Sequence, residues 1–265
     1  MGFQDTSDYT SVASHYDATR TIPFGLLHTC FERIFVKAGF PDLGRILDAG
    51  CGTAQVSLPL IKTGHSVVGV DVSPAMLEIA RQKLEPGDSA EFRLGDVRAL
   101  EDPRDSYDAV VVSKLFQHVG NWQSAVDELI RVTRNGGLFM HINEKGAFKH
   151  AVRRQFSTRC RERGYTDLYV GIKDRSELGE YLLAKSATSL AVDTHDLTWE
   201  KTITYGTALE HLRLKLHSEF WAVPDRAYDH ILAEVQTWVR AQPAGEETLE
   251  TMRPYLVAEV FIIRK

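Results

Sequence analysis

Residues 46–54 carry the sequence ILDAGCGTA, an apolar run that ends in an aspartate and then turns through two glycines. Residues 45–49 predict a buried strand, and residues 55–63 predict a helix that follows the turn. Because Gly50 and Gly52 have no Cβ, a ligand can approach their backbone closely, beside the unpaired amides of the helix N-terminus. In an open α/β sheet, ligands bind at such carboxyl ends of strands.

Strand-like and helical patterns alternate outward from this turn. Ser73 is placed to N-cap a helix that begins at Pro74, and Pro59 should distort the preceding helix or lie near its start. This alternation predicts a doubly wound, parallel α/β sheet. The further strands are expected at 65–71, 91–94, 107–113 and 138–142, and the second and third helices at 74–84 and 122–134.

The flanking regions predict additions to this sheet. Residues 8–40 have a helical pattern, and the strict alternation stops after residue 142. A final strand at 255–263 is expected to run antiparallel to its neighbours, which brings the sheet to seven strands. The other elements expected beyond residue 142 are helices at 146–163, 176–185, 207–216 and 225–240 and a strand at 190–203.

Composition places the chain among ordinary globular proteins. Of its 265 residues, 43% are hydrophobic and 25% charged, and the net charge of −5 disfavours nucleic acid and anionic membranes as partners. The polar start of the chain, and the lack of a run of about 18 apolar residues, predict a cytoplasmic protein without a membrane span. No CxxC pair occurs, so neither a metal site nor a disulfide is expected among Cys30, Cys51 and Cys160.

An acidic residue follows the second predicted strand at an informative distance. Asp71 lies nineteen residues beyond Gly52, the spacing at which one βαβ unit delivers a carboxylate to two ribose hydroxyls. A two-glycine turn alone is a weak signal, but together with Asp71 it indicates a ligand that contains adenosine. The alternative for each carboxylate is a helix-capping or solvated side chain.

Five motifs in order resemble the class I S-adenosylmethionine-dependent methyltransferases, and among them the small-molecule enzymes similar to those of ubiquinone and menaquinone biosynthesis. The resemblance covers about residues 9–143 and implies a Rossmann-like sheet and S-adenosylmethionine as cofactor. Ala54 departs from the family, which commonly has a third glycine there, and we expect tighter packing at this position. The motifs are LDAGCGTA (47–54), VVGVDVSPAMLEIAR (67–81), FRLGDV (92–97), YDAVVVSKLFQHV (107–119) and LIRVTRNGGLFMHIN (129–143).

The resemblance also implies roles for single residues. Asp71 would bind the ribose, and Val72 and Met76 would flank the adenine, although both are also ordinary core residues. The carboxylate of Asp96 would accept from the adenine amino group, and the amide of Val97 would meet a ring nitrogen. The methionine portion of the cofactor would be held by Asp48 and the backbone of Ala49, Gly50, Cys51 and Gly52.

The remaining implied contacts concern the amino-acid end of the cofactor. The carbonyl of Ser113 would receive the α-ammonium. Arg20, in the segment HYDATR, would clamp the α-carboxylate, with Tyr16 beside it, unless Arg20 is an ordinary surface arginine.

Methyl transfer requires mainly alignment and exclusion of water, and a general base helps only for some acceptors. His118 is the candidate base, with a structural histidine as the alternative, and Asn143 and Glu144 are other candidates. His141 is expected to be buried in its strand.

The sequence predicts a single domain, residues 1–265, with three parts. Residues 1–44 form an N-terminal helical cap, 45–143 the cofactor-binding core, and 144–265 a half whose helical insertions bind the acceptor. An aromatic pocket could involve Phe148, Tyr205 and Trp221, unless these only pack the helices. The basic residues that could meet an anionic acceptor, or merely form a solvated helix face, are Lys149, Arg153, Arg154, Arg159, Arg161 and Arg163.

The function that follows is methyl transfer from S-adenosylmethionine to a small-molecule acceptor, either anionic or aromatic. The alternatives are a tRNA or other nucleic-acid methyltransferase and a noncatalytic S-adenosylmethionine-binding protein. A nicotinamide dehydrogenase is disfavoured because GCGTAQ (50–55) lacks the last glycine of GxGxxG.

Overall fold

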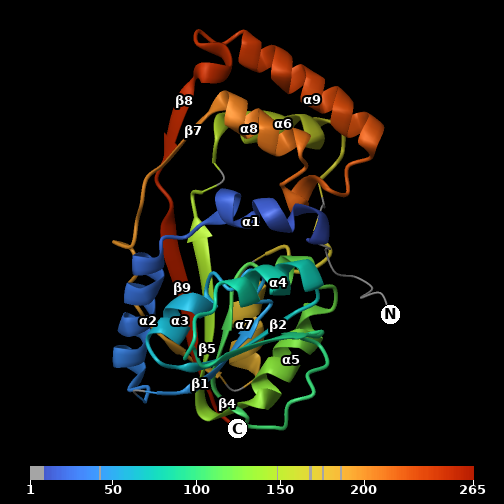
Figure 1. Ribbon diagram of the computed structural model, residues 1–265. Coiled ribbons are helices and arrows are strands. Elements are labelled where there is room, and N and C mark those ends of the chain that lie inside the picture. The colour runs from blue at the N-terminus through green and yellow to red at the C-terminus, as the bar shows by residue number, and fades with distance from the viewer. Residues whose placement is uncertain (1–8, 42, 148, 167–168, 175, 186) are drawn as a thin grey trace. The chain divides into compact units, whose positions relative to one another are not determined.

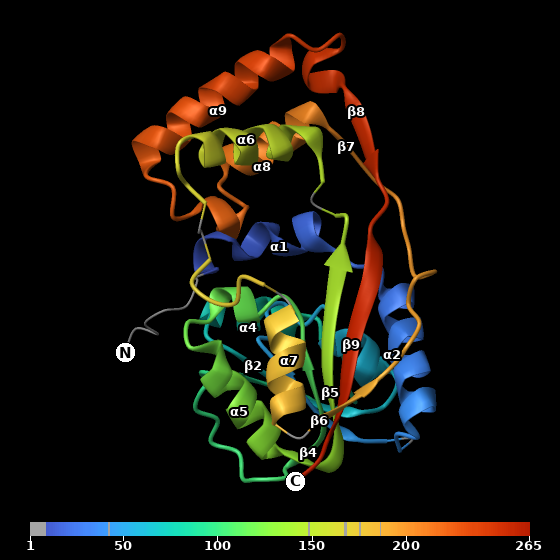
Figure 2. The same cartoon turned by 180° about the vertical axis from the view of Figure 1, so that it is seen from behind.

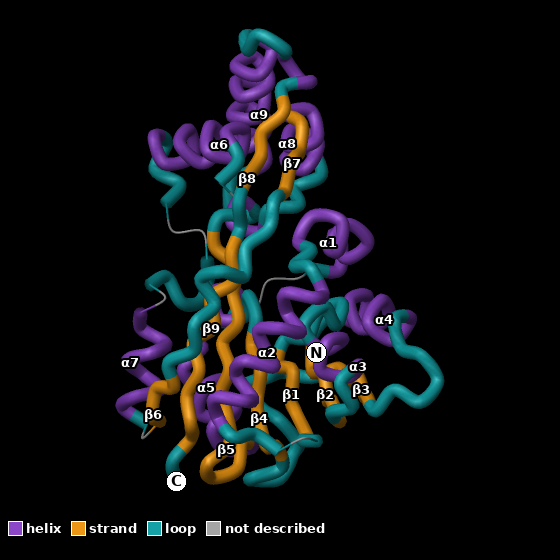
Figure 3. The backbone as a smooth tube through the Cα atoms, turned by 90° about the vertical axis from the view of Figure 1, so that its left-hand side faces the viewer, coloured by secondary structure: helices purple, strands orange, loops and turns teal. Residues whose placement is uncertain are grey.

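The protein contains a seven-stranded sheet of order β3-β2-β1-β4-β5-β9-β6. The computed structural model describes residues 9–265 apart from residues 42, 148, 167–168, 175 and 186. β1 to β5 run parallel, whereas β9 pairs antiparallel with β6, which confirms the mostly parallel Rossmann-like α/β fold. Figure 3 shows the strands side by side. They are β1 (Arg45–Ala49), β2 (Ser66–Asp71), β3 (Ala90–Leu94), β4 (Tyr107–Val112), β5 (Thr133–Lys145), β6 (Ala187–Leu190) and β9 (Tyr255–Ile263).

Helices cover both faces of this sheet. α2 (Phe24–Ala38) and α3 (Ser57–Lys62) lie on one side, and α5 (Trp122–Val132) and α7 (Ser176–Ala184) on the other (Figures 1 and 2). Alternate valines and leucines of the central strands pack against α5 and α7 in one apolar core, as expected for strands buried on both faces. The other elements that precede β5 are the helices α1 (Ala13–Arg20) and α4 (Pro74–Gln82) and the 3-10 turns Thr10–Val12 and Phe116–His118.

The first half of the chain agrees closely with the expectation. Ser73 caps α4 by accepting a hydrogen bond from the amide of Met76, and Pro74 occupies the first helical position. Pro59 is the third residue of α3, close to its start, and α3 is shorter than predicted because residues 52–56 form turns. β5 is longer than predicted, with a register shift opposite Tyr107 and Ala109.

The strand predicted at 190–203 is wrong. β6 ends at Leu190, and residues 201–204 form β7 (Lys201–Thr204), which pairs antiparallel with β8 (Leu249–Met252) in a separate two-stranded sheet. Carboxylates interrupt the intervening apolar pattern: Asp193 accepts from the amide of His195 in a local turn, and Asp196 pairs with Arg33. These contacts favour a turn over an extended strand.

The chain divides into two compact units. Unit 1 comprises the chain up to Asn143 together with Val170–Leu197 and Leu256–Lys265, and unit 2 comprises Glu144–Tyr169 and Thr198–Tyr255. Unit 2 has its own apolar core, formed where α6, α8 and α9 pack together. Its helical elements are α6 (Ala151–Glu162), α8 (Tyr205–Arg213) and α9 (Asp225–Arg240), with 3-10 turns at Ser218–Phe220 and Gly245–Glu247. No helix in the described ranges is long and apolar enough to span a membrane.

Two glycines provide a matched test of how tightly the backbone packs around β5. A Cβ on Gly137, within β5, would lie 2.7 Å from the carbonyl oxygen of Asp108 and 2.9 Å from that of Arg134. A Cβ on Gly25, in the first turn of α2, would meet nothing within 4 Å. We expect Gly137→Ala to lower the free energy of unfolding by about 1–3 kcal/mol and Gly25→Ala to raise it by up to about 1 kcal/mol. Urea unfolding followed by circular dichroism measures both, and equal effects would contradict the packing around Gly137.

Candidate functional site

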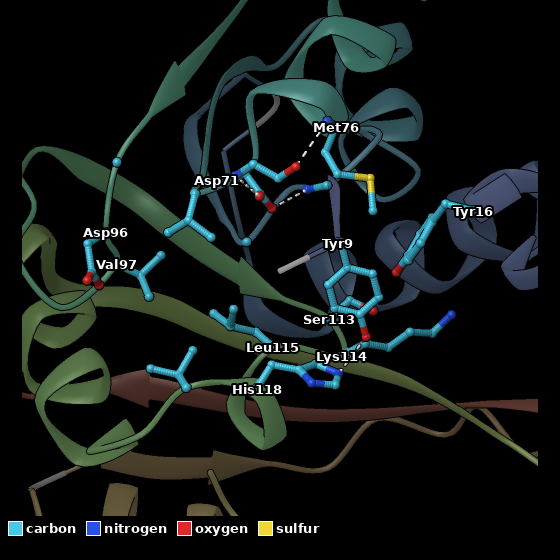
Figure 4. A pocket seen from close by; sticks show the side chains of 16 residues that line it. Tyr9, Tyr16, Asp71, Met76, Asp96, Val97, Ser113, Lys114, Leu115 and His118 are labelled. Atoms are coloured by element: carbon cyan, nitrogen blue, oxygen red, sulfur yellow. Dashed lines mark hydrogen bonds between the residues drawn. The ribbon is translucent and has the colours of Figure 1, made fainter. Parts of the chain in front are cut away.

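A cavity lies at the carboxyl ends of β1, β2, β3 and β4, within unit 1 (Figure 4). Of the predicted site residues, ten line it: Tyr16, Gly50, Gly52, Asp71, Val72, Met76, Asp96, Val97, Ser113 and His118. Six further lining residues were not predicted: Tyr9, Ser73, Gly95, Lys114, Leu115 and Val119. Most of these adjoin a predicted residue in sequence, so a longer reading of each strand end would have found them. Tyr9 belongs to the helical stretch predicted at 8–40, which could lie over the open end of the sheet, but it was assigned no contact.

The glycine turn has the backbone conformation that its sequence suggests. Gly50 and Gly52 have φ values of +72° and +51°, and a Cβ on Gly50 would lie 2.6 Å from the side chain of Leu115. On Gly52 a Cβ would meet nothing within 4 Å, so this glycine faces open space. Ala54 is fully buried with a φ of +65°, which explains why glycine is favoured at this position.

Asp71 joins the glycine turn to the end of β2. Its carboxylate accepts from the Gly52 amide at 2.9 Å and from the Ser73 amide at 2.9 Å. Burial raises the pKa of Asp71, and the two amide hydrogen bonds oppose that rise. Each carboxylate oxygen keeps a second lone pair, so the group can still accept hydrogen bonds from a ligand.

Asp48, Ala49, Cys51 and Arg20 do not line the cavity. The carboxylate of Asp48 is on the α3 side of β1, where it accepts from the Ser57 hydroxyl at 2.6 Å and is 1% exposed. Burial raises the pKa of Asp48 to about 7. In this conformation Asp48 supports α3, and a direct contact with a ligand stays a prediction.

Asp96 is held by a neighbouring arginine. Arg98 donates to both carboxylate oxygens through Nε and Nη2, at 2.7–3.0 Å. Partial burial raises the pKa of Asp96, but the hydrogen bonds and charge of Arg98 outweigh it and lower the pKa overall. Asp96 is therefore an ionised acceptor beside Val97, as an adenine amino group would require.

Residues from the N-terminal segment close one side of the cavity. The rings of Tyr9 and Tyr16 meet edge to face at 5.8 Å, and the guanidinium of Arg20 lies 5.8 Å and 5.1 Å from the two ring centroids. The Tyr9 hydroxyl lies 2.9 Å from Nε2 of His118 (Figure 4). Arg20 is thus a buried cation next to Tyr16, as predicted, but it packs on the rings instead of lining the cavity.

The electrostatics of His118 argue against a strong general base. Burial, with a smaller contribution from Arg20, lowers the pKa of His118 to about 3. The imidazole is therefore neutral at physiological pH and takes up a proton only weakly. Its observed contact is the hydrogen bond to Tyr9.

The other candidate bases lie outside the cavity lining. His141 is buried. Its Nδ1 lies 2.7 Å from a carboxylate oxygen of Glu259, and its Nε2 lies 2.6 Å from the side-chain nitrogen Nδ2 of Asn143. Glu144 is also buried. His141 and Asn143 therefore belong to a hydrogen-bonded chain between β5 and β9.

In unit 2 several basic residues of α6, and Arg163 just after it, make ion pairs within the unit. Arg153 pairs with Glu219, Arg159 and Arg163 with Glu234, and Arg154 lies 3.6 Å from Glu250. Of the predicted aromatic residues, Tyr205 stacks on Trp238, Trp221 donates to the carbonyl of Lys215, and Phe148 lies outside the described residues.

Comparison with known proteins identifies the class. Residues 46–137 match the methyltransferase domain family. The demethylmenaquinone methyltransferase of Thermus thermophilus is 37% identical over 148 residues, which cover 53% of this chain and 67% of that protein. That of Clavibacter sepedonicus is 35% identical over 135 residues, which cover 51% of this chain and 55% of that protein.

A solved structure shares the fold. Phosphoethanolamine N-methyltransferase 2 of Haemonchus contortus, in complex with S-adenosyl-L-methionine, has a TM-score of 0.56 at 16% identity, covering 99% of this chain and 59% of that one. The chain spans about half the length of several curated relatives that it matches. It belongs to the class I S-adenosylmethionine-dependent methyltransferases, in the group similar to quinone-biosynthesis enzymes, as its five motifs predicted. The cofactor of this class is S-adenosylmethionine.

The low pKa of His118 makes a testable contribution to stability. In the unfolded chain a histidine has a pKa of about 6.5. Below this pH the unfolded chain therefore binds a proton at His118, whereas the folded protein binds it only near pH 3. The folded state is therefore fully favoured above pH ~6.5 and loses stability as the pH falls, by about 2 kcal/mol at pH ~5. Urea unfolding at these two pH values should show a smaller loss for His118→Asn than for the parent. The exposed His195→Asn is the control, and an unchanged loss in His118→Asn would contradict the burial.

The N-terminal segment also predicts the kinetics of cofactor binding. The cavity has a volume of about 70 Å³, smaller than ordinary ligand sites of ~300–1,000 Å³, so we expect residues 9–20 to move outward when a nucleoside enters. Asp17 fastens this segment by accepting from the Thr53 hydroxyl at 2.6 Å and pairing with Lys83 at 2.5 Å. We expect Asp17→Asn to raise the association and dissociation rates of S-adenosylhomocysteine by about two- to fivefold in stopped-flow fluorescence. Asp225→Asn in unit 2 is the control, and unchanged rates in Asp17→Asn would show that this contact does not limit entry.

Proposed function

We propose that this protein transfers a methyl group from S-adenosylmethionine to a small-molecule acceptor. The observation that carries the proposal is the placement of Asp71, whose partly buried carboxylate accepts from the Gly52 and Ser73 amides at the wall of the cavity. A fixed carboxylate with lone pairs to spare suits a pair of vicinal hydroxyls. The open face of Gly52 supports the same ligand, because a Cβ there would occupy space next to the turn.

The remaining cavity residues fit an adenosine group. Met76 and Val72 supply apolar walls, and Asp96 supplies an ionised acceptor. When bound, S-adenosylmethionine supplies an electrophilic methyl group on a sulfonium. The protein's task is to hold the acceptor atom in line with that methyl group and to exclude water. Tyr9 and Tyr16 serve the second requirement by closing one side of the cavity.

We assign His118 to positioning and not to proton abstraction. Its lowered pKa makes it a poor base, and its hydrogen bond to Tyr9 fixes the N-terminal segment over the cavity. This favours acceptors that need little base assistance, such as an already ionised oxygen or an electron-rich carbon.

For the acceptor we propose an aromatic small molecule of the quinone-precursor type. The support is the names of the similar demethylmenaquinone methyltransferases. The family match ends at residue 137, so unit 2 lies beyond it. We propose that unit 2, with its separate core, supplies acceptor specificity.

The same unit gives little support to a nucleic-acid acceptor. Phosphate binding needs arginines that are available to the backbone of the nucleic acid. Glutamates of unit 2 form ion pairs with three of these arginines, Arg153, Arg159 and Arg163. A noncatalytic binding protein is separated from an enzyme by the transfer assay below.

The test is binding and transfer by Asp71→Asn. The amide keeps the shape of the carboxylate but loses its charge, so we expect the affinity for S-adenosylhomocysteine to fall by about 2–4 kcal/mol in calorimetry while the fold is retained. The exposed Asp193→Asn is the control. The parent protein should label demethylated quinol precursors with a radioactive methyl group. Unchanged affinity in Asp71→Asn would overturn the site, and binding without transfer to any small acceptor would favour the noncatalytic alternative.

A further inference from the structure

Lys114 is the one positively charged side chain among the described residues that line the cavity, where His118 is neutral. It follows Ser113 in the loop after β4, and in Figure 4 its side chain extends toward the side of the cavity occupied by Tyr16. Its ammonium lies 3.4 Å from the carbonyl oxygen of Arg20. The motif comparison gave this residue no role.

Arg20 is less suited to pair with an anionic ligand in this structure. Its guanidinium is buried against the rings of Tyr9 and Tyr16, and it does not line the cavity. A cation in this position stabilises the two rings through cation–π attraction. Arg20 therefore supports the cavity wall from behind.

The charges of the ligand restrict where a lysine can be tolerated. S-adenosylmethionine carries two cations, the sulfonium and the α-ammonium, and one anion, the α-carboxylate. A lysine beside the sulfonium would repel it in a partly desolvated site, whereas a lysine beside the carboxylate is attractive. Asp71 and Asp96 repel the carboxylate from the opposite part of the cavity.

We propose that Lys114, rather than Arg20, pairs with the α-carboxylate of the cofactor and thereby selects ligands that carry the amino-acid group. The inference rests on the proposed function. The ammonium and carboxylate of an amino acid are bound to the same carbon, so their partners in the protein must be neighbours. Ser113, whose carbonyl would receive the ammonium, and Lys114 are adjacent in the sequence.

The loop that carries Lys114 is fixed beside the glycine turn. Leu115 packs so closely against Gly50 that a Cβ there would clash with it at 2.6 Å. Lys114 itself has a φ of +54°, a left-handed conformation that costs lysine and methionine about the same free energy. Lys114→Met therefore removes the charge without a new backbone penalty.

The experiment compares two ligands in calorimetry. S-adenosylhomocysteine carries the carboxylate, and 5′-methylthioadenosine lacks the whole amino-acid group. We expect Lys114→Met to weaken binding of S-adenosylhomocysteine about tenfold or more and to leave binding of methylthioadenosine within about twofold, with Lys114→Arg close to the parent. Arg20→Met should weaken both ligands alike. Lys62→Met, which removes an ion-paired lysine on α3, is the matched control.

The outcomes separate the two proposals. If the parent protein binds neither ligand, the proposed function fails. If the parent binds both but Lys114→Met affects them equally or not at all, or if Arg20→Met selectively loses S-adenosylhomocysteine, the assignment of Lys114 is wrong. An unchanged affinity for S-adenosylhomocysteine with a raised KM for the acceptor would likewise overturn it, and would place Lys114 at the acceptor.

Discussion

The site depends on one carboxylate that two strand ends share. Asp71 ends β2, and by accepting from the amide of Gly52 it fixes the turn that follows β1. Without this contact, a glycine-rich turn with positive φ angles would have many alternative conformations. The same carboxylate accepts from Ser73, whose side chain caps α4. One partly buried carboxylate therefore orders the glycine turn, the strand end and the next helix, which together form the floor of the cavity.

The opposite wall uses aromatic rings and a buried cation instead of a backbone turn. Arg20 holds Tyr9 and Tyr16, Tyr9 reaches His118, and Asp17 fastens the segment to Thr53 and Lys83. These contacts are individually modest and can break one after another, whereas the floor is part of the sheet. A rigid floor with a weakly fastened cover allows a large ligand to enter and still excludes water afterwards.

The floor could be predicted from sequence because its determinants are local. β2 is a buried apolar run that ends in Asp71, and Asp96 comes two residues after the end of β3. The role of Asp48 was harder to predict, because the side chain of a strand residue faces one side or the other, and here its partner Ser57 lies on α3. The pairing of β7 with β8 joins residues more than forty positions apart, so no local sequence pattern predicts it. The predicted strand at 190–203 failed because Asp193 accepts from the nearby amide of His195 in a turn, and Asp196 pairs with Arg33 of α2.

Arg20 and Lys114 show how far a family resemblance can assign a charge. The resemblance carried Arg20 to the ligand's carboxylate because arginine suits a bidentate clamp. In this chain the guanidinium packs on two tyrosine rings, and Lys114 is the residue with a positive charge that lines the cavity among the described residues. The chemical requirement, one cation near one carboxylate, is met by either residue, so a pattern of residue types cannot distinguish them. The placement of the two side chains does distinguish them, because Lys114 lines the cavity whereas Arg20 packs on the tyrosine rings outside its lining, and the proposal for Lys114 rests on this difference.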